Sequence, residues 1–148
     1  MKHHTHILAG IILTEGCLIF SGFKLQTQTF LDPYVLKECL PFFAAFFIGS
    51  IFPDFDFMLP IPHRTVMHWP LVYAGFALLT FFNYPLVFVF CIASLVHVLM
   101  DSFTMMGVPI INPFGKKYGF GLMITGGYKE LTFSVLLLCL IILIFIRF

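Results

Sequence analysis

The sequence has little charge, and this shortage excludes a soluble protein. Charged residues make up 10% and hydrophobic residues 60% of the 148 residues, whereas a soluble domain averages about 25% charged residues. The mean hydropathy is +1.02. Too little polar surface remains to keep the chain in water. We therefore expect one domain, residues 1–148, that lies in a membrane.

The sequence also lacks the signatures of nucleic-acid-binding proteins and of disulfide-rich or CxxC-type proteins. The net charge is only +1, so the basic footprint of a nucleic-acid-binding protein is missing. The cysteines form neither a CxxC pair nor a disulfide framework, and each lies inside an apolar stretch: Cys17, Cys39, Cys91 and Cys139. We interpret them as small packing residues.

What the sequence does contain is apolar segments of membrane-spanning length. Five can be drawn, over about residues 5–23, 34–52, 65–82, 85–104 and 129–146. Each has roughly the 17–20 residues that a helix needs to cross a bilayer. Pro53 ends the second segment, and the Asn83–Pro85 turn separates the third from the fourth. The sequence predicts an all-α membrane protein, a bundle of about five transmembrane helices.

The ionisable residues gather at one end of these segments. If the chain crosses five times, the ends that lie on the N-terminal face of the membrane carry His3, His4, His6, Asp54, Asp56, His63, Arg64, His68, His97, Asp101 and Glu130. The exceptions are Asp32 and Glu38 at the opposite face and Glu15 within the first segment. Random placement would divide these residues between both faces. We therefore predict a polar site at the N-terminal face.

The spacing of these residues suits a metal ion. His97 and Asp101 are four residues apart, so they share one face of a helix. Asp54 and Asp56 follow a proline and can direct two carboxylates into one pocket, and His63 and His68 bracket the start of the next segment. Imidazole with carboxylate suits zinc, manganese or iron. With so many candidate ligands, we expect two ions, about 3.5–4 Å apart, that hold a phosphoryl group and activate water.

Other interpretations stay open at this point. A membrane-end histidine is commonly an interfacial residue, and Lys116 with Lys117 is either a solvated pair or a phosphate contact. A non-enzymatic metal transporter or sensor would place ligands near the bilayer midplane, on a path to both faces, and Glu15 is the residue that favours it. A structural protein leaves the charges inside the apolar fourth segment unexplained, because each costs about 2.5–3.5 kcal/mol to insert.

Several motifs together resemble a known family, the YdjM-type inner-membrane metal-dependent hydrolases. In order, they are His6 with Gly10, Pro53-Asp54-Phe55-Asp56, His63-Arg64-xxx-His68, His97-xxx-Asp101-xx-Thr104-xx-Gly107-Val108-Pro109, Asn112-Pro113-Phe114 and Glu130. One block departs from the family pattern His-Arg-Gly-x-Thr-His-Ser, since residues 63–69 read His-Arg-Thr-Val-Met-His-Trp. Roles of the missing glycine, threonine and serine therefore do not transfer.

The resemblance implies a metal-dependent hydrolase of phosphoester or pyrophosphate bonds in a bacterial inner membrane. The small, apolar chain suggests a lipid or lipid-linked phosphate as substrate, and a UDP-2,3-diacylglucosamine pyrophosphatase of lipid A synthesis is one candidate. We expect zinc or manganese to be bound by His6, Asp54, Asp56, His68, His97 and Asp101. The predicted catalytic residues are His63, Arg64, which would clamp a phosphate, and Glu130.

Basic residues predict the orientation of the chain. On the five-crossing interpretation, the N-terminal face carries Lys2, Arg64, Lys116, Lys117 and Lys129, against Lys24, Lys37 and Arg147 on the other. The positive-inside rule then places the N-terminal face, and the site, in the cytoplasm. The sequence leaves open the oligomeric state and which of His3, His4 and His6 binds the metal.

Overall fold

A computed structural model describes residues 1–20 and 33–147 of the chain. Within these ranges it does not describe the side chains of residues 13–20, 33–36, 38, 39 and 144–147. The predicted polar stretch after the first segment, and the side chains of Glu15, Asp32 and Glu38, therefore lie outside the described residues.

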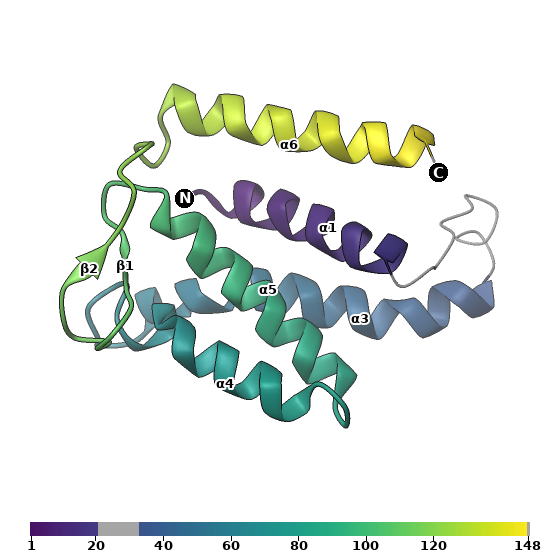
Figure 1. Cartoon of the computed structure of the whole chain (residues 1–148), viewed down its shortest axis with the longest axis horizontal. Helices are drawn as coiled ribbons and strands as arrows, with labels where there is room; N and C mark the ends of the chain where they lie inside the picture. The colour runs from purple at the N-terminus through teal and green to yellow at the C-terminus, as the bar shows by residue number, and fades with distance from the viewer. Residues whose placement is uncertain (21–32, 148) are drawn as a thin grey trace.

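The described part of the chain is mostly helical, as predicted (Figure 1). Its α-helices are α1 (His3–Phe20), α3 (Pro33–Ile51), α4 (Pro70–Thr80), α5 (Pro85–Ser102) and α6 (Tyr128–Arg147). Two short 3₁₀ helices, η1 (Phe52–Met58) and η2 (Val66–His68), lie between α3 and α4. Proline occupies the first position of α4 and of α5, where its missing N–H costs nothing.

Two segments of the described chain are long and apolar enough to cross a membrane. They are Leu40–Met58 and Pro85–Ser102. The prediction of about five transmembrane helices is therefore supported only in part. The third predicted span is wrong, because α4 has 11 residues and reaches about 17 Å, well short of the roughly 30 Å of hydrocarbon. Residues 65–69 form η2 and a turn instead, and helix begins only at Pro70.

The helices pack in layers around α1 and α5. Helix α1 lies between α6 on one side and α3 with α5 on the other, while α4 packs on α5 (Figure 1). Helices α3 and α5 approach closely at Gly49, where an added Cβ would lie 2.4 Å from the carbonyl oxygen of Phe90. The Ser94 hydroxyl donates to the Gly49 carbonyl across this contact at 3.0 Å.

A short hairpin follows α5 at the end of the molecule where the chain begins (Figure 1). Strands β1 (Val108–Pro109) and β2 (Lys117–Tyr118) pair antiparallel. Gly107 has φ +64°, and an added Cβ would meet the Tyr118 backbone at 2.5 Å, so only glycine fits this crossing. The hairpin therefore lies beside the C-terminal end of α5.

Candidate metal centre

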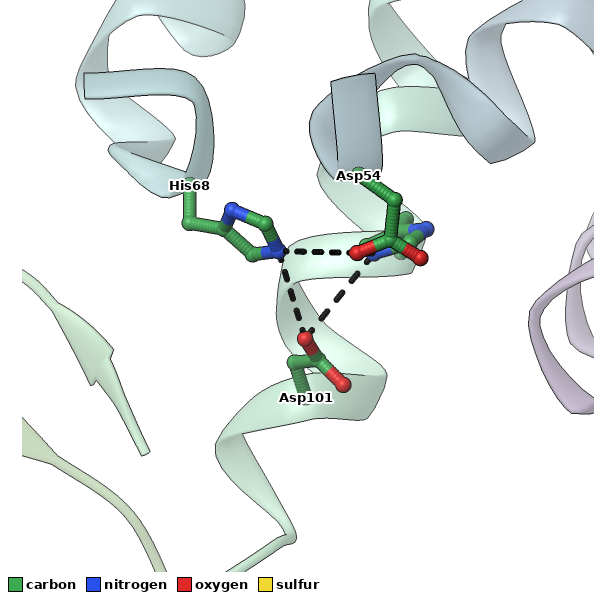
Figure 2. Close-up of side chains that lie close together, drawn as sticks. Asp54, His68 and Asp101 are labelled. Atoms are coloured by element: carbon green, nitrogen blue, oxygen red, sulfur yellow. Dashed lines mark ion pairs between the residues drawn. The ribbon is translucent and has the colours of Figure 1, made fainter. Parts of the chain in front are cut away.

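Four predicted ligands come together in a buried cluster at this end of the molecule. Asp54, His68, His97 and Asp101 each offer one ligand atom, and these atoms all lie within 4.8 Å of one another. His68 Nε2 lies 3.4 Å from Asp54 Oδ1 and 3.3 Å from Asp101 Oδ2. Figure 2 shows the labelled side chains of Asp54, His68 and Asp101 pointing toward one another. We refer to these four residues as the four-ligand cluster.

Three elements bring this cluster together. His97 and Asp101 lie one turn apart on α5, as their spacing predicted. Asp54 lies in η1, directly after the proline that ends α3, and His68 is the last residue of η2. Asp54 is the most exposed of the four, with 10% of its side chain accessible, whereas the other three side chains are at most 1% exposed.

The histidines present unpaired nitrogens to this cluster. His97 Nδ1 lies 2.7 Å from the carbonyl oxygen of Ser50, to which it donates, so its Nε2 carries the lone pair. Among the described residues, His97 Nε2 and both ring nitrogens of His6 and of His68 are buried without a hydrogen-bond partner. Leaving such groups unsatisfied costs about 1–3 kcal/mol each. A metal ion in the cluster would take one nitrogen of each ring that it binds, so the donor set fits a metal.

Of the three N-terminal histidines, His6 is the one that lies buried beside the four-ligand cluster. Its ring stacks on His97 with centroids 3.7 Å apart, and its Nε2 lies 3.5 Å from Asp101 Oδ1. His3 reaches Asp54 from the rim at 3.2 Å with 61% of its side chain exposed, and His4 is exposed. The α-amino group of Met1 also forms an ion pair with Asp101.

Asp56 belongs to a second group, on the other side of His68. One of its carboxylate oxygens accepts from His63 Nδ1 at 2.7 Å, and the other accepts from the backbone N–H of Arg64 at 2.8 Å. His68 Nδ1 lies 3.2 Å from that second oxygen. Asp56, His63 and His68 could together hold an ion. The expectation that Asp54 and Asp56 point into one pocket is therefore wrong, because His68 lies between them.

The carboxylates around His68 raise the pKa of its imidazole. Burial alone would lower the pKa of His68, but the carboxylates of Asp101, Asp54 and Asp56 beside the ring outweigh that penalty and hold the pKa above its ordinary value. The metal-free ring therefore keeps its proton to higher pH than an exposed histidine. Because a ligand imidazole must give up that proton, metal binding at this site should strengthen as the pH rises.

Arg64 lies beside the four-ligand cluster, but its guanidinium is held by groups of the protein itself. Its Nη2 lies 3.0 Å from Asp101 Oδ2, and its Nη1 donates to Thr104 Oγ1 at 2.7 Å and to the Gly107 carbonyl at 3.3 Å. The side chain is 3% exposed. Its backbone has φ +58°, an uncommon conformation for a residue other than glycine. This geometry favours a role in orienting Asp101 over the predicted phosphate clamp.

Glu130 lies in neither group of ligand atoms. Its carboxylate accepts from the backbone N–H of Gly126 at 2.6 Å, from Thr5 Oγ1 at 3.0 Å and from the backbone N–H of Lys2. It is 1% exposed. Glu130 therefore fastens the start of α1 to the start of α6, which differs from the catalytic role that the sequence suggested.

Sequence reasoning missed two partners of the site. The Ser50 carbonyl fixes the tautomer of His97, and no side-chain pattern could reveal a backbone acceptor. Thr104 was part of the motif but was given no role, and it accepts from Arg64. Lys117 is also engaged, because its Nζ donates to the His63 carbonyl at 2.9 Å, whereas Lys116 is exposed.

Comparison with known proteins supports the family that the sequence motifs suggested. The family model described as YdjM inner membrane protein matches residues 1–148. Neither the curated proteins nor the solved structures contain a match to this chain. The family description agrees with the apolar composition and with the two helices that could cross a membrane. Since the match covers the whole chain, this protein belongs to the YdjM inner membrane protein family.

Proposed function

We propose that this protein is a membrane-embedded, metal-dependent hydrolase that cleaves a phosphoester or pyrophosphate bond of a lipid-borne substrate. The observation that carries the proposal is the buried four-ligand cluster, in which imidazole nitrogens without partners face two carboxylates. Such a donor set is costly unless it binds something. The resemblance to metal-dependent hydrolases supplies the reaction class.

The residues that would hold the ion are those of the four-ligand cluster, with His6 as a fifth donor. Nitrogen and oxygen donors without thiolate suit zinc or manganese. When bound, such an ion polarises a phosphoryl oxygen and lowers the pKa of water. Asp54 is the least buried member. The site would therefore open to substrate on the side of η1.

The number of ions depends on His68. The four-ligand cluster and the Asp56 group share this residue, through opposite ring nitrogens. Two ions bridged in this way could not approach to the roughly 3.5–4 Å of a two-metal clamp. We therefore favour one ion in the four-ligand cluster. Asp56 would then be the acceptor that orients His68 and His63, and an ion in the Asp56 group is the alternative.

His63 is the group of this site best placed to exchange protons with water. Its side chain is 23% exposed, while its Nδ1 is held by the buried Asp56 carboxylate at 2.7 Å. A histidine held by a carboxylate is a common general acid or base. Its ring lies with its centroid 5.0 Å from that of His68. His63 could therefore deliver a proton to the leaving group beside the ion.

A membrane hydrolase with this site would act on lipids of one leaflet. Helices α4 and α5 form a hairpin (Figure 1). His68 lies just before α4 and Asp101 near the end of α5, so the hairpin starts and ends at the site. The hairpin therefore returns the chain to the same membrane face whether or not α4 crosses the whole membrane. If α1, α3 and α6 each cross once, the termini lie on opposite faces. The positive-inside count then places the site in the cytoplasm. UDP-2,3-diacylglucosamine is one substrate that meets these conditions.

The test is metal analysis of the purified protein combined with release of phosphate or nucleotide from a panel of lipid pyrophosphates. We expect about one ion per chain, activity that disappears with a chelator, and recovery when zinc or manganese is restored. Asp101→Asn is the matched control, since it keeps the shape of the side chain and removes a ligand charge. Full activity in a metal-free preparation would contradict the proposal.

A metal transporter or sensor remains the alternative function. It predicts ligands along a path to both faces. In the part of the chain that the structure describes, the candidate ligand atoms gather around His68 and not along a path, which favours the hydrolase. Metal uptake by sealed vesicles containing the protein, without hydrolysis of any lipid phosphate, would support the transporter instead.

A further inference from the structure

An apolar groove of about 660 Å³ runs along α5. We refer to it as the α5 groove, and its lining includes Ile92, Leu95, Val96 and Leu99 of α5, Ile110 after β1, and Phe120 after β2. Val96, Val98 and Val108 form a buried floor, whereas Leu99 is 51% and Phe120 is 69% exposed at the rim. Its size lies within the range of small-molecule sites, about 300–1,000 Å³.

The α5 groove is separate from the metal centre. Each residue turns an α-helix by about 100°, so Leu95 and Leu99 lie nearly opposite His97 on α5. The groove therefore uses the face of α5 that the four-ligand cluster does not. Helix α5 is long and apolar enough to span a membrane. In a membrane that α5 crosses, the apolar lining of the groove would face the hydrocarbon, and its occupant would come from there.

The outer wall of the groove is fixed to α5 by backbone hydrogen bonds. Phe120 N–H donates to the Ser102 carbonyl at 2.8 Å, and Leu122 N–H donates to the Phe103 carbonyl at 2.9 Å. At Gly119, an added Cβ would lie 2.7 Å from the Cα of Gly107. The wall is therefore held in place by main-chain contacts, and the groove is pre-formed.

The charge at this wall has one sign. Residues 102–129 contain three lysines and no aspartate or glutamate. Lys116 is exposed, and its Nζ lies 5.6 Å from the ring centroid of Tyr118, which lines the groove. Lys117 is tied to the His63 carbonyl, which leaves Lys116 available to a ligand. An anionic group at the end of an apolar chain matches this arrangement.

We propose that the α5 groove binds one acyl chain of an anionic phospholipid from the surrounding bilayer, with the lipid phosphate at Lys116. The apolar lining selects the chain, and the lysine selects the charge of the headgroup. This site does not depend on the hydrolase activity, because it shares no side chain with the four-ligand cluster. A lipid held here would brace the hairpin, which directly follows Thr104 and Gly107, two partners of Arg64.

Trp69 reports on the groove. It is the single tryptophan of the chain, and its indole N–H donates to the carbonyl of Ile110 at 2.9 Å, while Ile110 and Pro70 line the groove. The full-length protein would be placed in bilayers of phosphatidylcholine with increasing phosphatidylglycerol. Bromine would be carried on the acyl chains of one lipid at a time, because brominated chains quench tryptophan on contact.

We expect brominated phosphatidylglycerol to quench Trp69 at about fivefold lower mole fraction than brominated phosphatidylcholine. A fivefold preference is about what the attraction between one lysine and one anionic headgroup provides. Lys116→Gln should abolish this preference, while Lys37→Gln, which removes an exposed lysine of α3, should keep it. Leu99→Asn should weaken quenching by both lipids, and Leu78→Asn, at an exposed position of α4 outside the groove, should not.

Three results would overturn the proposal. Equal quenching by the two lipids would remove the charge selection. Unchanged quenching in Leu99→Asn would move the lipid out of the groove. A mass of the reconstituted particle that corresponds to two chains, with dimerisation lost in Leu99→Asn, would assign the groove to a second copy of this protein. Metal content measured in the same variants should stay at the wild-type value.

Discussion

Replacing Asp56 with asparagine tests whether this residue binds an ion or holds the residues that do. The Asp56 carboxylate accepts from His63 Nδ1 at 2.7 Å and from the Arg64 N–H at 2.8 Å, and it lies 3.2 Å from His68 Nδ1. Asparagine keeps the size and one acceptor but loses the charge. It also offers an amide N–H that cannot accept from His63 or His68.

The size of the expected effect follows from the position of Asp56 beside the four-ligand cluster. Losing a group that orients a metal ligand typically lowers metal affinity about 10- to 100-fold, which is about 1.4–2.8 kcal/mol. We therefore expect Asp56→Asn to bind the same number of ions as the wild type, but about 10- to 100-fold more weakly. Asp54→Asn, two residues earlier on η1, should lose the ion, because Asp54 belongs to the cluster itself.

The assay is competition between the detergent-solubilised protein and a chelator of known zinc affinity, with ions per chain counted by elemental mass spectrometry. Circular dichroism and thermal unfolding without metal would establish that both variants fold. The opposite result would be a wild type that binds two ions and an Asp56→Asn variant that loses one ion and binds the remaining ion as tightly as the wild type. That result would make Asp56 a ligand of a second ion.

Further predictions concern His97, Arg64, Glu130 and the orientation of the chain in the membrane. His97→Ala should abolish hydrolysis while the protein still inserts and folds; turnover near that of the wild type would exclude α5 from the site. Arg64→Lys should lower the hydrolysis rate at least about tenfold, because one ammonium cannot replace a fork that reaches both Asp101 and Thr104, and equal rates would remove that role. Glu130→Gln should destabilise the protein by about 1–3 kcal/mol in unfolding experiments with the metal content unchanged; loss of the ion without loss of stability would instead make Glu130 a ligand. A C-terminal fluorescent-protein fusion should be dark and a C-terminal phosphatase fusion active; the reverse would break the proposed orientation.

The membrane character and most helices were predictable because they depend on local composition. An apolar segment must satisfy its backbone within itself, so long apolar runs become helices, and prolines mark the starts of α4 and α5. The length of α4 was not predictable in this way. Residues 65–69 are apolar enough to continue a helix, but they are bent into η2, which carries His68 to the four-ligand cluster.

The pairing of His97 with Asp101 also follows from the sequence, since the period of an α-helix fixes it. The separation of Asp54 from Asp56 does not. Both lie in η1, where each residue turns the chain by about 120°, so side chains two residues apart point in different directions. Which direction meets His68 depends on how η1 is rotated against η2, and packing sets that rotation.

Residue types and their gathering at one end were therefore determined by the sequence, whereas the role of each residue was decided by the tertiary structure. Asp56, Arg64 and Glu130 carry the charges that a catalytic site needs, and sequence reasoning placed all three in it. In the fold, each is occupied by donors or acceptors that come from distant segments. A role depends on which lone pair or N–H remains unpaired after folding, and long-range contacts alone determine that.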